Sequence, residues 1–430
     1  MPAETLARSL PGPGAPPARA ALGAPRVLAV GYNGANNTGA EALLLADIAD
    51  LRAVLGPNVQ ITVPTLNAAN LRRYLSEGKG VEIAEVPGVF LRHVRRLVAR
   101  SDVLVLVEGS AYMDTWTPAL LWYFLWATHC AHRFGKPALA YAVDAGEMSS
   151  FDRWLTRRVA SKTDLIVARS AGAAERLRSF GVTAPIEVTA DNALRFELEP
   201  ADEGWLERTW PEAETGVVGI ALVDFNLFPV VVRPWGRRAD CYRWPYYFAR
   251  SPERRQASEA LATAYAALVD RIVREHDRAV ALICMEELDE RLALAVHGRL
   301  ADGTRARVFS SRALDASKMT VLLRGLEVLV TSRYHASILS LAAQVPQLAV
   351  GHDLRLRTLY DELGLAQLFH TPDEPDLVEA VADDVGALLR SPEATKEALR
   401  QGHAVELARA RRNPELLRAF FAARGWPVEE

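Results

Sequence analysis

The chain has 430 residues and a formal net charge of −3, with half of its residues hydrophobic and 24% charged. This balance is typical of a globular protein, and the length suggests two or three domains. Because acids and bases are interspersed without a basic excess, the composition excludes a dedicated nucleic-acid binder. Cys130, Cys241 and Cys284 lack metal-ligand spacing and cannot form an even-numbered framework, which predicts buried thiols in a reducing compartment.

The N-terminus carries no recognisable targeting segment. Residues 1–24 are rich in Ala, Pro and Gly and lack the continuous apolar stretch of a secretion signal, which predicts a disordered leader. The longest apolar run, residues 119–127, is far shorter than the roughly 20 residues that span a bilayer. We therefore expect a cytoplasmic protein with no transmembrane segment.

Residues 25–205 alternate between apolar strands and helices, which predicts a doubly wound parallel sheet as the first domain. Polar loops that follow these strands should lie together along one edge of the sheet. Strands are expected at 26–31, 59–63, 102–107, 137–143, 165–168 and 186–189, with helices beginning near 38, 118, 151 and 170.

The loop at 31–39 is rich in glycine and asparagine and leads from a strand into a helix. That arrangement suits a backbone cradle around an anionic group, although it matches neither a dinucleotide fingerprint nor a Walker loop. Thr38 and Glu41 have the spacing of a capping box, so Glu41 is either a helix cap or a ligand contact. The candidate acceptor-binding residues here are Asn33, Asn36, Asn37 and Glu41.

Residues 206–385 repeat this plan and predict a second domain, after an acidic, irregular linker at about 200–215. Residues 386–430 read as a helical tail that packs back on the linker region. Strands are expected near 216–223, 279–285, 307–309, 327–331 and 345–350, with helices near 253–276 and 316–325.

The segment 224–252 is unusual because it carries eight aromatic residues between Phe225 and Phe248 and five arginines. Such a mixture can stack on sugar rings and bind an anionic acceptor. The alternative is a long loop that its aromatics hold to the surface. Trp235 and Trp244 are the candidate acceptor-binding residues in this segment.

The stretch 329–341 is a buried strand that leads directly into a helix, with Arg333 and His335 at the junction. Such junctions bind anions in α/β proteins, arginine offers a planar fork of donors, and histidine can transfer a proton near neutral pH. The alternative is structural, with Arg333 paired to an acid and His335 capping the helix.

Five stretches carry a family resemblance: 31–43, 169–181, 189–193, 332–336, and 345–346 with Asp353. On these motifs the chain resembles the polysaccharide pyruvyl transferase family, whose members transfer a pyruvyl group from phosphoenolpyruvate to sugar hydroxyls as a ketal. The residues 332–336, similar to the family's Arg-x-His-Ala motif, are the most specific. The resemblance implies two Rossmann-like domains facing a cleft, as in glycosyltransferases of the B type.

The resemblance and the demands of the reaction assign roles to residues. Phosphoenolpyruvate would be a co-substrate, with no metal and no other cofactor, and the partners would be this donor and a saccharide acceptor. The sequence does not decide whether the protein contacts a lipid-linked acceptor at the membrane surface, or whether it forms a homo-oligomer. The candidate donor-binding residues are Arg333, Ser332, His335, Glu287 and Asp353, and the candidate catalytic residues are His335, Arg333, Asp114 and Asp191.

Two alternatives remain. One is a nucleotide-sugar glycosyltransferase with the same architecture. Retaining members of that class commonly carry a glutamate on the helix after this strand, and the absence of an acid in residues 337–343 argues against it. The other is a catalytically degenerate relative that binds a sugar. It is suggested by departures from the family pattern at Ala40 and in the glycine loop 108–110. The lysine that is usual after the position of Asp353 is also missing, and Leu354 and Arg355 stand there instead.

Overall fold

The computed structural model describes residues 23–211 and 216–429. The leader expected at 1–24 falls outside these residues except for its last two positions. Within the described ranges, no helix combines the length and apolar character needed to cross a membrane.

The first domain is built on a seven-stranded parallel sheet in the order β3-β2-β1-β4-β5-β6-β7. Successive residues of β1 enter opposite buried clusters, because side chains alternate across a strand and helices cover both faces. The strands are β1 (Arg26–Val30), β2 (Gln60–Thr65), β3 (Val81–Glu85), β4 (Val103–Leu106), β5 (Ala138–Val143), β6 (Leu165–Ala168) and β7 (Ile186–Val188).

Helix α2 packs on one face of this sheet, and α4 to α7 pack on the other. The short α3 also follows β2 on the α2 side. The helices are α2 (Thr38–Leu55), α3 (Ala68–Leu71), α4 (Leu91–Arg100), α5 (Pro118–Arg133), α6 (Ser150–Ala160) and α7 (Ala171–Ser179).

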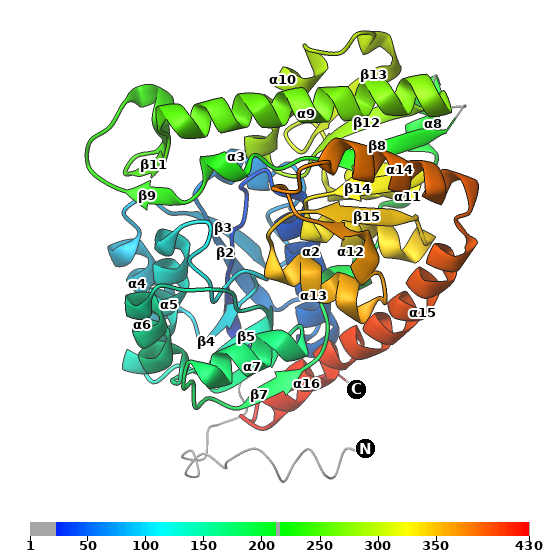
Figure 1. Ribbon diagram of the computed structural model, residues 1–430. Helices are drawn as coiled ribbons and strands as arrows, with labels where there is room; N and C mark the ends of the chain where they lie inside the picture. Colours follow the sequence, from blue (N-terminus) through cyan, green and yellow to red (C-terminus); the bar gives the residue numbers. More distant parts are fainter. Residues whose placement is uncertain (1–22, 212–215, 430) are drawn as a thin grey trace.

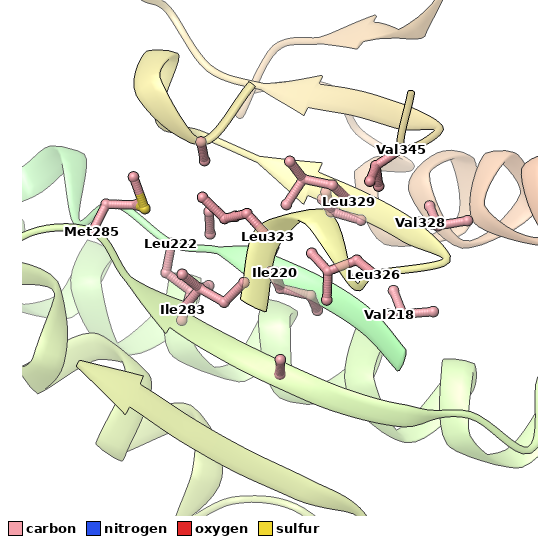
Figure 2. Close-up of a cluster of buried hydrophobic side chains, with 14 of the residues drawn as sticks. Val218, Ile220, Leu222, Ile283, Met285, Leu323, Leu326, Val328, Leu329 and Val345 are labelled. Carbon is pink, nitrogen blue, oxygen red and sulfur yellow. The ribbon is translucent and has the colours of Figure 1, made fainter. Parts of the chain in front are cut away.

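The second domain repeats the plan with a six-stranded parallel sheet in the order β13-β12-β8-β14-β15-β16. Figure 2 shows Ile220, Ile283 and Leu329, from three neighbouring strands, packing with Leu323 of α11. The strands are β8 (Val217–Ala221), β12 (Ala279–Cys284), β13 (Ala306–Ser310), β14 (Val328–Thr331), β15 (Gln347–Val350) and β16 (Phe369–His370). The helices are α9 (Pro252–His276), α10 (Glu290–His297), α11 (Ala316–Arg324), α12 (Tyr334–Ser340), α13 (Leu354–Glu362) and α14 (Leu377–Arg390).

The C-terminal helices return the chain to the first domain (Figure 1, orange to red). The short α8 (Trp205–Thr209) precedes β8, while α15 (Glu393–Ala410) and α16 (Arg412–Ala422) follow α14. Leu417 and Phe421 of α16 join Leu51 of α2 in one buried cluster. The Asn413 side chain donates to the carbonyl of Ala190 at 3.2 Å. The tail therefore contributes apolar surface to the core of the first domain.

The segment 224–252, for which a loop was one expectation, contains a small antiparallel sheet. Its order is β10-β11-β9, formed by β9 (Val230–Val232), β10 (Cys241–Arg243) and β11 (Tyr246–Phe248). The sheet reaches the first domain: Val230 N–H donates to the Trp116 carbonyl at 2.7 Å, and the Tyr246 hydroxyl to the Gly88 carbonyl at 2.5 Å. Strands of three residues leave little periodicity to read. The chain is thus an α/β protein of two Rossmann-like domains, with this sheet bridging them.

Candidate active site

A cavity of about 330 Å³ lies between the two domains, where the carboxyl ends of both parallel sheets face each other. This position is where open α/β sheets bind ligands, and the volume lies within the range of small-molecule sites. Among the predicted site residues, Asn33, Asn36, Asn37, Glu287, Ser332, Arg333, His335 and Asp353 line the cavity.

The glycine- and asparagine-rich loop is joined to the second domain through its backbone. Thr38 N–H donates to the Met285 carbonyl at 2.8 Å, and Glu287 N–H donates to the Asn36 carbonyl at 3.1 Å. The Asn36 side chain donates to the Glu287 carboxylate. The loop therefore forms the floor between the domains, and its asparagines are held in place before any ligand arrives.

The predicted capping box at the start of α2 is wrong. Asn37 is the N-cap, and its side-chain oxygen accepts from Ala40 N–H at 3.1 Å. Glu41 lies outside the cavity, only 1% exposed, with one carboxylate oxygen 3.4 Å from Arg73. Burial raises the pKa of Glu41 to about 8, and Arg73 only partly offsets this. The structure does not bring Glu41 to the site of the other acceptor candidates.

Arg333 is held by two acids of the second domain and also lines the cavity. Its Nε donates to Asp289 at 3.0 Å and its Nη1 to Glu286 at 3.1 Å, while Nη2 also donates to Asp289. Burial alone would lower the pKa of the Arg333 guanidinium, but the two carboxylates raise it above its ordinary value. Arg333 is therefore paired with acids, as the structural interpretation expected, and it also lies at the cavity, where the functional interpretation stays a prediction.

His335 is fixed between the two domains. Its ring rests against Gly39, where a Cβ would overlap the imidazole, and its Nε2 lies 3.5 Å from an Asp191 oxygen. Gly39 and Asp191 belong to the first domain, whereas His335 belongs to α12 of the second. His335 is not the cap of α12, because Arg333 occupies the N-cap position. The ring thus has the support that a proton-transferring group needs.

Asp191 supports this histidine from behind the cavity, which it does not line. It accepts from Arg169 at 2.5 Å, and Arg169 also donates to Asp144 at 2.9 Å. Burial alone would raise the pKa of Asp191, but Arg169 and His335 hold it well below its ordinary range. The Arg169 guanidinium lies under the ring of Tyr334, 4.2 Å from the centroid. Asp191 is therefore an ionised, buried partner of His335.

Two charged cavity residues, Arg355 and Glu108, were not assigned from the sequence. Arg355 pairs with Asp353 and lies over the Trp116 ring at 5.7 Å. Glu108 accepts from Tyr32 N–H at 3.1 Å and from the Ser110 hydroxyl. The sequence features that could have identified them are simple. Arg355 is a basic residue two places after Asp353, and Glu108 is an acid at the end of a buried strand.

Glu286 was also missed as a site residue. It accepts from the Tyr32 hydroxyl at 3.2 Å as well as from Arg333, so it joins the two walls of the cavity. It begins the acidic run 286–290, which resembles an ordinary complement to a helix dipole. Only its contact with Arg333, 47 positions later, distinguishes a site residue from such a complement.

Besides Glu41 and Asp191, three other predicted residues do not line the cavity. Asp114 accepts from Ser149 N–H at 2.7 Å at the edge of the first domain. Trp235 and Trp244 are 73% and 56% exposed, and neither lines the cavity. Aromatic contacts with a ligand would come instead from Trp116, Tyr123, Phe228 and Tyr242.

The cavity is mixed in charge. Its charged residues are Glu108, Glu286, Glu287, Asp353, Arg243, Arg333, Arg355 and His335. Because Arg333 pairs with Glu286 and Arg355 with Asp353, no strong positive field covers the site. An anionic ligand would be bound by individual donors aimed at it, with a histidine beside it and carboxylates opposite. That set of groups can carry out acid–base chemistry on a small acid and a polyol.

The comparisons with known proteins agree with this architecture. A family model described as polysaccharide pyruvyl transferase matches residues 37–353. No curated protein sequence matches the chain. The solved structure of Anabaena HepE with UDP-glucose is similar, with a TM-score of 0.60 and 12% identity over 93% of this chain and all of that chain. The UDP-GlcNAc 2-epimerase of Neisseria meningitidis gives a TM-score of 0.57 and 10% identity over 91% and 98%. At such identities, the likeness shows a shared fold.

Proposed function

This chain belongs to the polysaccharide pyruvyl transferase family, and from that premise we propose that it transfers the pyruvyl group of phosphoenolpyruvate to hydroxyls of a saccharide as a ketal. One observation carries the proposal: His335, held by Gly39 and Asp191, lines the same cavity as the charged fork of Arg333. A proton donor beside an anion-binding arginine is what addition to an enolpyruvate requires.

The reaction needs one proton delivered and two removed. Protonation of the donor's methylene carbon makes its neighbouring carbon electrophilic, and a first sugar hydroxyl attacks there and loses its proton. The carbon–oxygen bond to phosphate then breaks, and a second hydroxyl closes the ketal ring and loses its proton. One proton stays in the new methyl group and the other leaves with inorganic phosphate.

The cavity residues divide among these tasks. His335 protonates the methylene carbon, with Asp191 holding the ring, so Asp191 is a positioning residue rather than the base. Arg333, Ser332 and the N-terminus of α12 bind the donor's carboxylate or phosphate. Glu287 and Asp353 position Asn36 and Arg355, their hydrogen-bonding partners.

The hydroxyl protons go to a carboxylate of the first domain's wall. Glu108 lines the cavity, and among the described residues no arginine or lysine forms an ion pair with it. Asp114 does not line the cavity, so we assign this role to Glu108 instead. Asn33, Asn36 and Asn37 shape the acceptor side through the loop that they hold.

Phosphate release tests the proposal. Purified protein is incubated with phosphoenolpyruvate and a panel of saccharides carrying neighbouring free hydroxyls, and phosphate and the ketal product are measured together by colorimetry and mass spectrometry. We expect stoichiometric phosphate and ketal with at least one acceptor, no product from the His335→Ala variant, and retained activity in Asp114→Asn. Release of a nucleoside diphosphate from a sugar nucleotide, with no phosphate from phosphoenolpyruvate, would replace the proposal with the glycosyltransferase alternative.

A further inference from the structure

Helix α4 presents a cationic face to solvent. Its sequence, residues 91–100, contains no acid, and Val94 and Val98 hold it to the first domain. The exposed side chains on the rest of the helix include Arg92, His93, Arg95, Arg96 and Arg100. Among the described residues, none of these arginines forms an ion pair with a carboxylate. A helix with one buried apolar stripe and a basic face without acidic partners can bind a negatively charged surface.

Large apolar side chains are exposed at the start of this helix and on the small sheet, at the end of β9, in the β9–β10 loop and in the β10–β11 turn. Val89 and Leu91 are 53% and 47% exposed, and Val232, Trp235 and Trp244 are 42%, 73% and 56% exposed. The two groups belong to one surface, since the Trp244 carbonyl lies against Gly88 and the Tyr246 hydroxyl donates to the Gly88 carbonyl. Figure 1 shows α4 below β9 and β11 on the same side of the molecule.

The charge on this surface has one sign. We call residues 88–100 and 232–245 the basic aromatic surface. Its exposed charged residues outside α4 are Arg237, Arg238 and Arg243, and its single acid, Asp240, is only 8% exposed. The whole chain is nevertheless slightly acidic, with a net charge of −3. This surface is therefore net positive, although the chain as a whole is net negative.

We propose that the basic aromatic surface docks on the headgroups of an anionic lipid bilayer. Tryptophan partitions into the interface between headgroups and acyl chains, and arginines beside it pair with lipid phosphates. The exposed tryptophans, Leu91 and valines, beside arginines that form no ion pair among the described residues, meet both requirements. Exposed tryptophans beside several arginines that have no acidic partner match a layer that is anionic at its headgroups and apolar beneath them.

The surface adjoins the cavity. Phe90, Arg243 and Tyr246 belong to it or to its edge and also line the cavity. Docking would hold the cavity mouth at the bilayer, within reach of a saccharide carried on a lipid. This last step rests on the proposed function, whereas the docking itself does not depend on any reaction.

Vesicle sedimentation of the full-length protein tests the docking without substrates. We expect binding to phosphatidylglycerol-containing vesicles, little binding to pure phosphatidylcholine vesicles, and loss of binding as salt is raised. The variant Arg92→Glu/Arg96→Glu/Arg237→Glu should lower the partition coefficient by about 100-fold or more, since each basic residue contributes about tenfold or less. Trp235→Ser/Trp244→Ser should lower it by about tenfold at every salt concentration.

Matched controls carry the same changes elsewhere. Arg274 and Arg390 are exposed arginines of the second domain, and Leu294 is a 57% exposed apolar residue. Arg274→Glu/Arg390→Glu and Leu294→Ser should bind vesicles like the parent protein. Equal binding by the parent and the Arg92/Arg96/Arg237 variant, or equal binding to neutral and anionic vesicles, overturns the proposal. A dimer that the tryptophan variant dissociates, with no vesicle binding, would assign the surface to a second copy instead.

Activity separates this inference from the proposed function. With a water-soluble saccharide, the Arg92→Glu/Arg96→Glu/Arg237→Glu variant should release phosphate at the parental rate. If vesicle binding occurs but no saccharide yields phosphate, the docking surface stands and the reaction fails. If phosphate appears but no vesicle binds, the reaction stands and the docking fails.

Discussion

Two arginines occupy comparable places in the two domains and end with different tasks. Arg169 directly follows β6 and Arg333 follows β14, and each guanidinium donates to two carboxylates. The Arg169 side chain has no exposed surface, whereas Arg333 is 12% exposed and lines the cavity. The same residue after the same kind of strand is thus part of the scaffold in one domain and a wall of the site in the other.

What covers each arginine makes the difference. Tyr334 lies over the Arg169 guanidinium, and Gly109 contacts it so closely that a Cβ there would overlap Nη1. Arg169 reaches the chemistry only through Asp191, which faces His335. Arg333 has no such cover on its cavity side. Pairing with acids therefore does not by itself identify a structural arginine. Whether other residues cover the guanidinium decides whether it can contact a ligand.

Removing each guanidinium gives the largest expected contrast. Arg169→Met leaves Asp144 and Asp191 buried without a cation, which should lower the free energy of unfolding by about 3–5 kcal/mol. Arg333→Met should cost less, because Glu286 lines the cavity and water there can replace part of the lost interaction, although Asp289 is as buried as the two acids around Arg169. Urea unfolding of both variants measures the difference. Equal losses would mean that Arg333 is as much a part of the scaffold as Arg169.

The contact between Gly39 and His335 should show itself in a double-mutant cycle. Gly39→Ala forces the imidazole away from Asp191, which should lower turnover by about 100-fold and also reduce stability. In the His335→Ala background the ring is gone, and the same change should be neutral or slightly stabilising because alanine favours the helix.

Urea unfolding of the two single variants and the double variant measures this coupling, and phosphate release by Gly39→Ala measures the loss of turnover. A stability cost for Gly39→Ala that is unchanged by His335→Ala would mean that the α2 backbone, and not the histidine, requires glycine.

The sequence predicted the strands and loops that form this site better than the contacts between their side chains. Strand β6 was predicted at residues 165–168, as found, because buried parallel strands read as continuous apolar runs. Arg333 and His335 were identified because both stand at one strand–helix junction. The contact between Asp191, a candidate catalytic residue, and Arg169 could not be predicted, because Arg169 lies 22 positions away and no local pattern reports such a contact. Spacing suggested that Glu41 caps α2, but its contact Arg73 follows the unpredicted α3.

Glu41 and Arg73 form a third acid–arginine pair, which shows that burial can outweigh the pairing in setting the pKa of the acid. One oxygen of Glu41 lies 3.4 Å from Arg73, a longer contact than those of Arg169, and the other has no hydrogen-bond partner among the described residues. The pKa of Glu41 in the folded protein, about 8, lies above the ordinary value of 4.5. Between these values the folded state keeps a proton that the unfolded state has lost, so stability falls as pH rises.

Between pH 6 and pH 8 this loss should be about 2 kcal/mol, and Glu41→Gln should remove it. Urea unfolding at the two pH values measures the slope for the parent and the variant. Glu82→Gln, a change at an exposed glutamate of β3, is the control and should keep the parental slope. A slope unchanged in Glu41→Gln would mean that Arg73 neutralises Glu41 as fully as Arg169 neutralises Asp191.

The smallest expected effect returns to Arg333 and depends on geometry alone. Arg333→Lys keeps the positive charge between Glu286 and Asp289 but loses the planar fork that aims a donor into the cavity. We expect the KM for phosphoenolpyruvate to rise by about tenfold, with kcat and the unfolding midpoint nearly unchanged. Initial-rate measurements at saturating acceptor separate the two constants. A fall in kcat at constant KM would instead place Arg333 at the reacting carbon, because only contacts made in the transition state act on kcat alone.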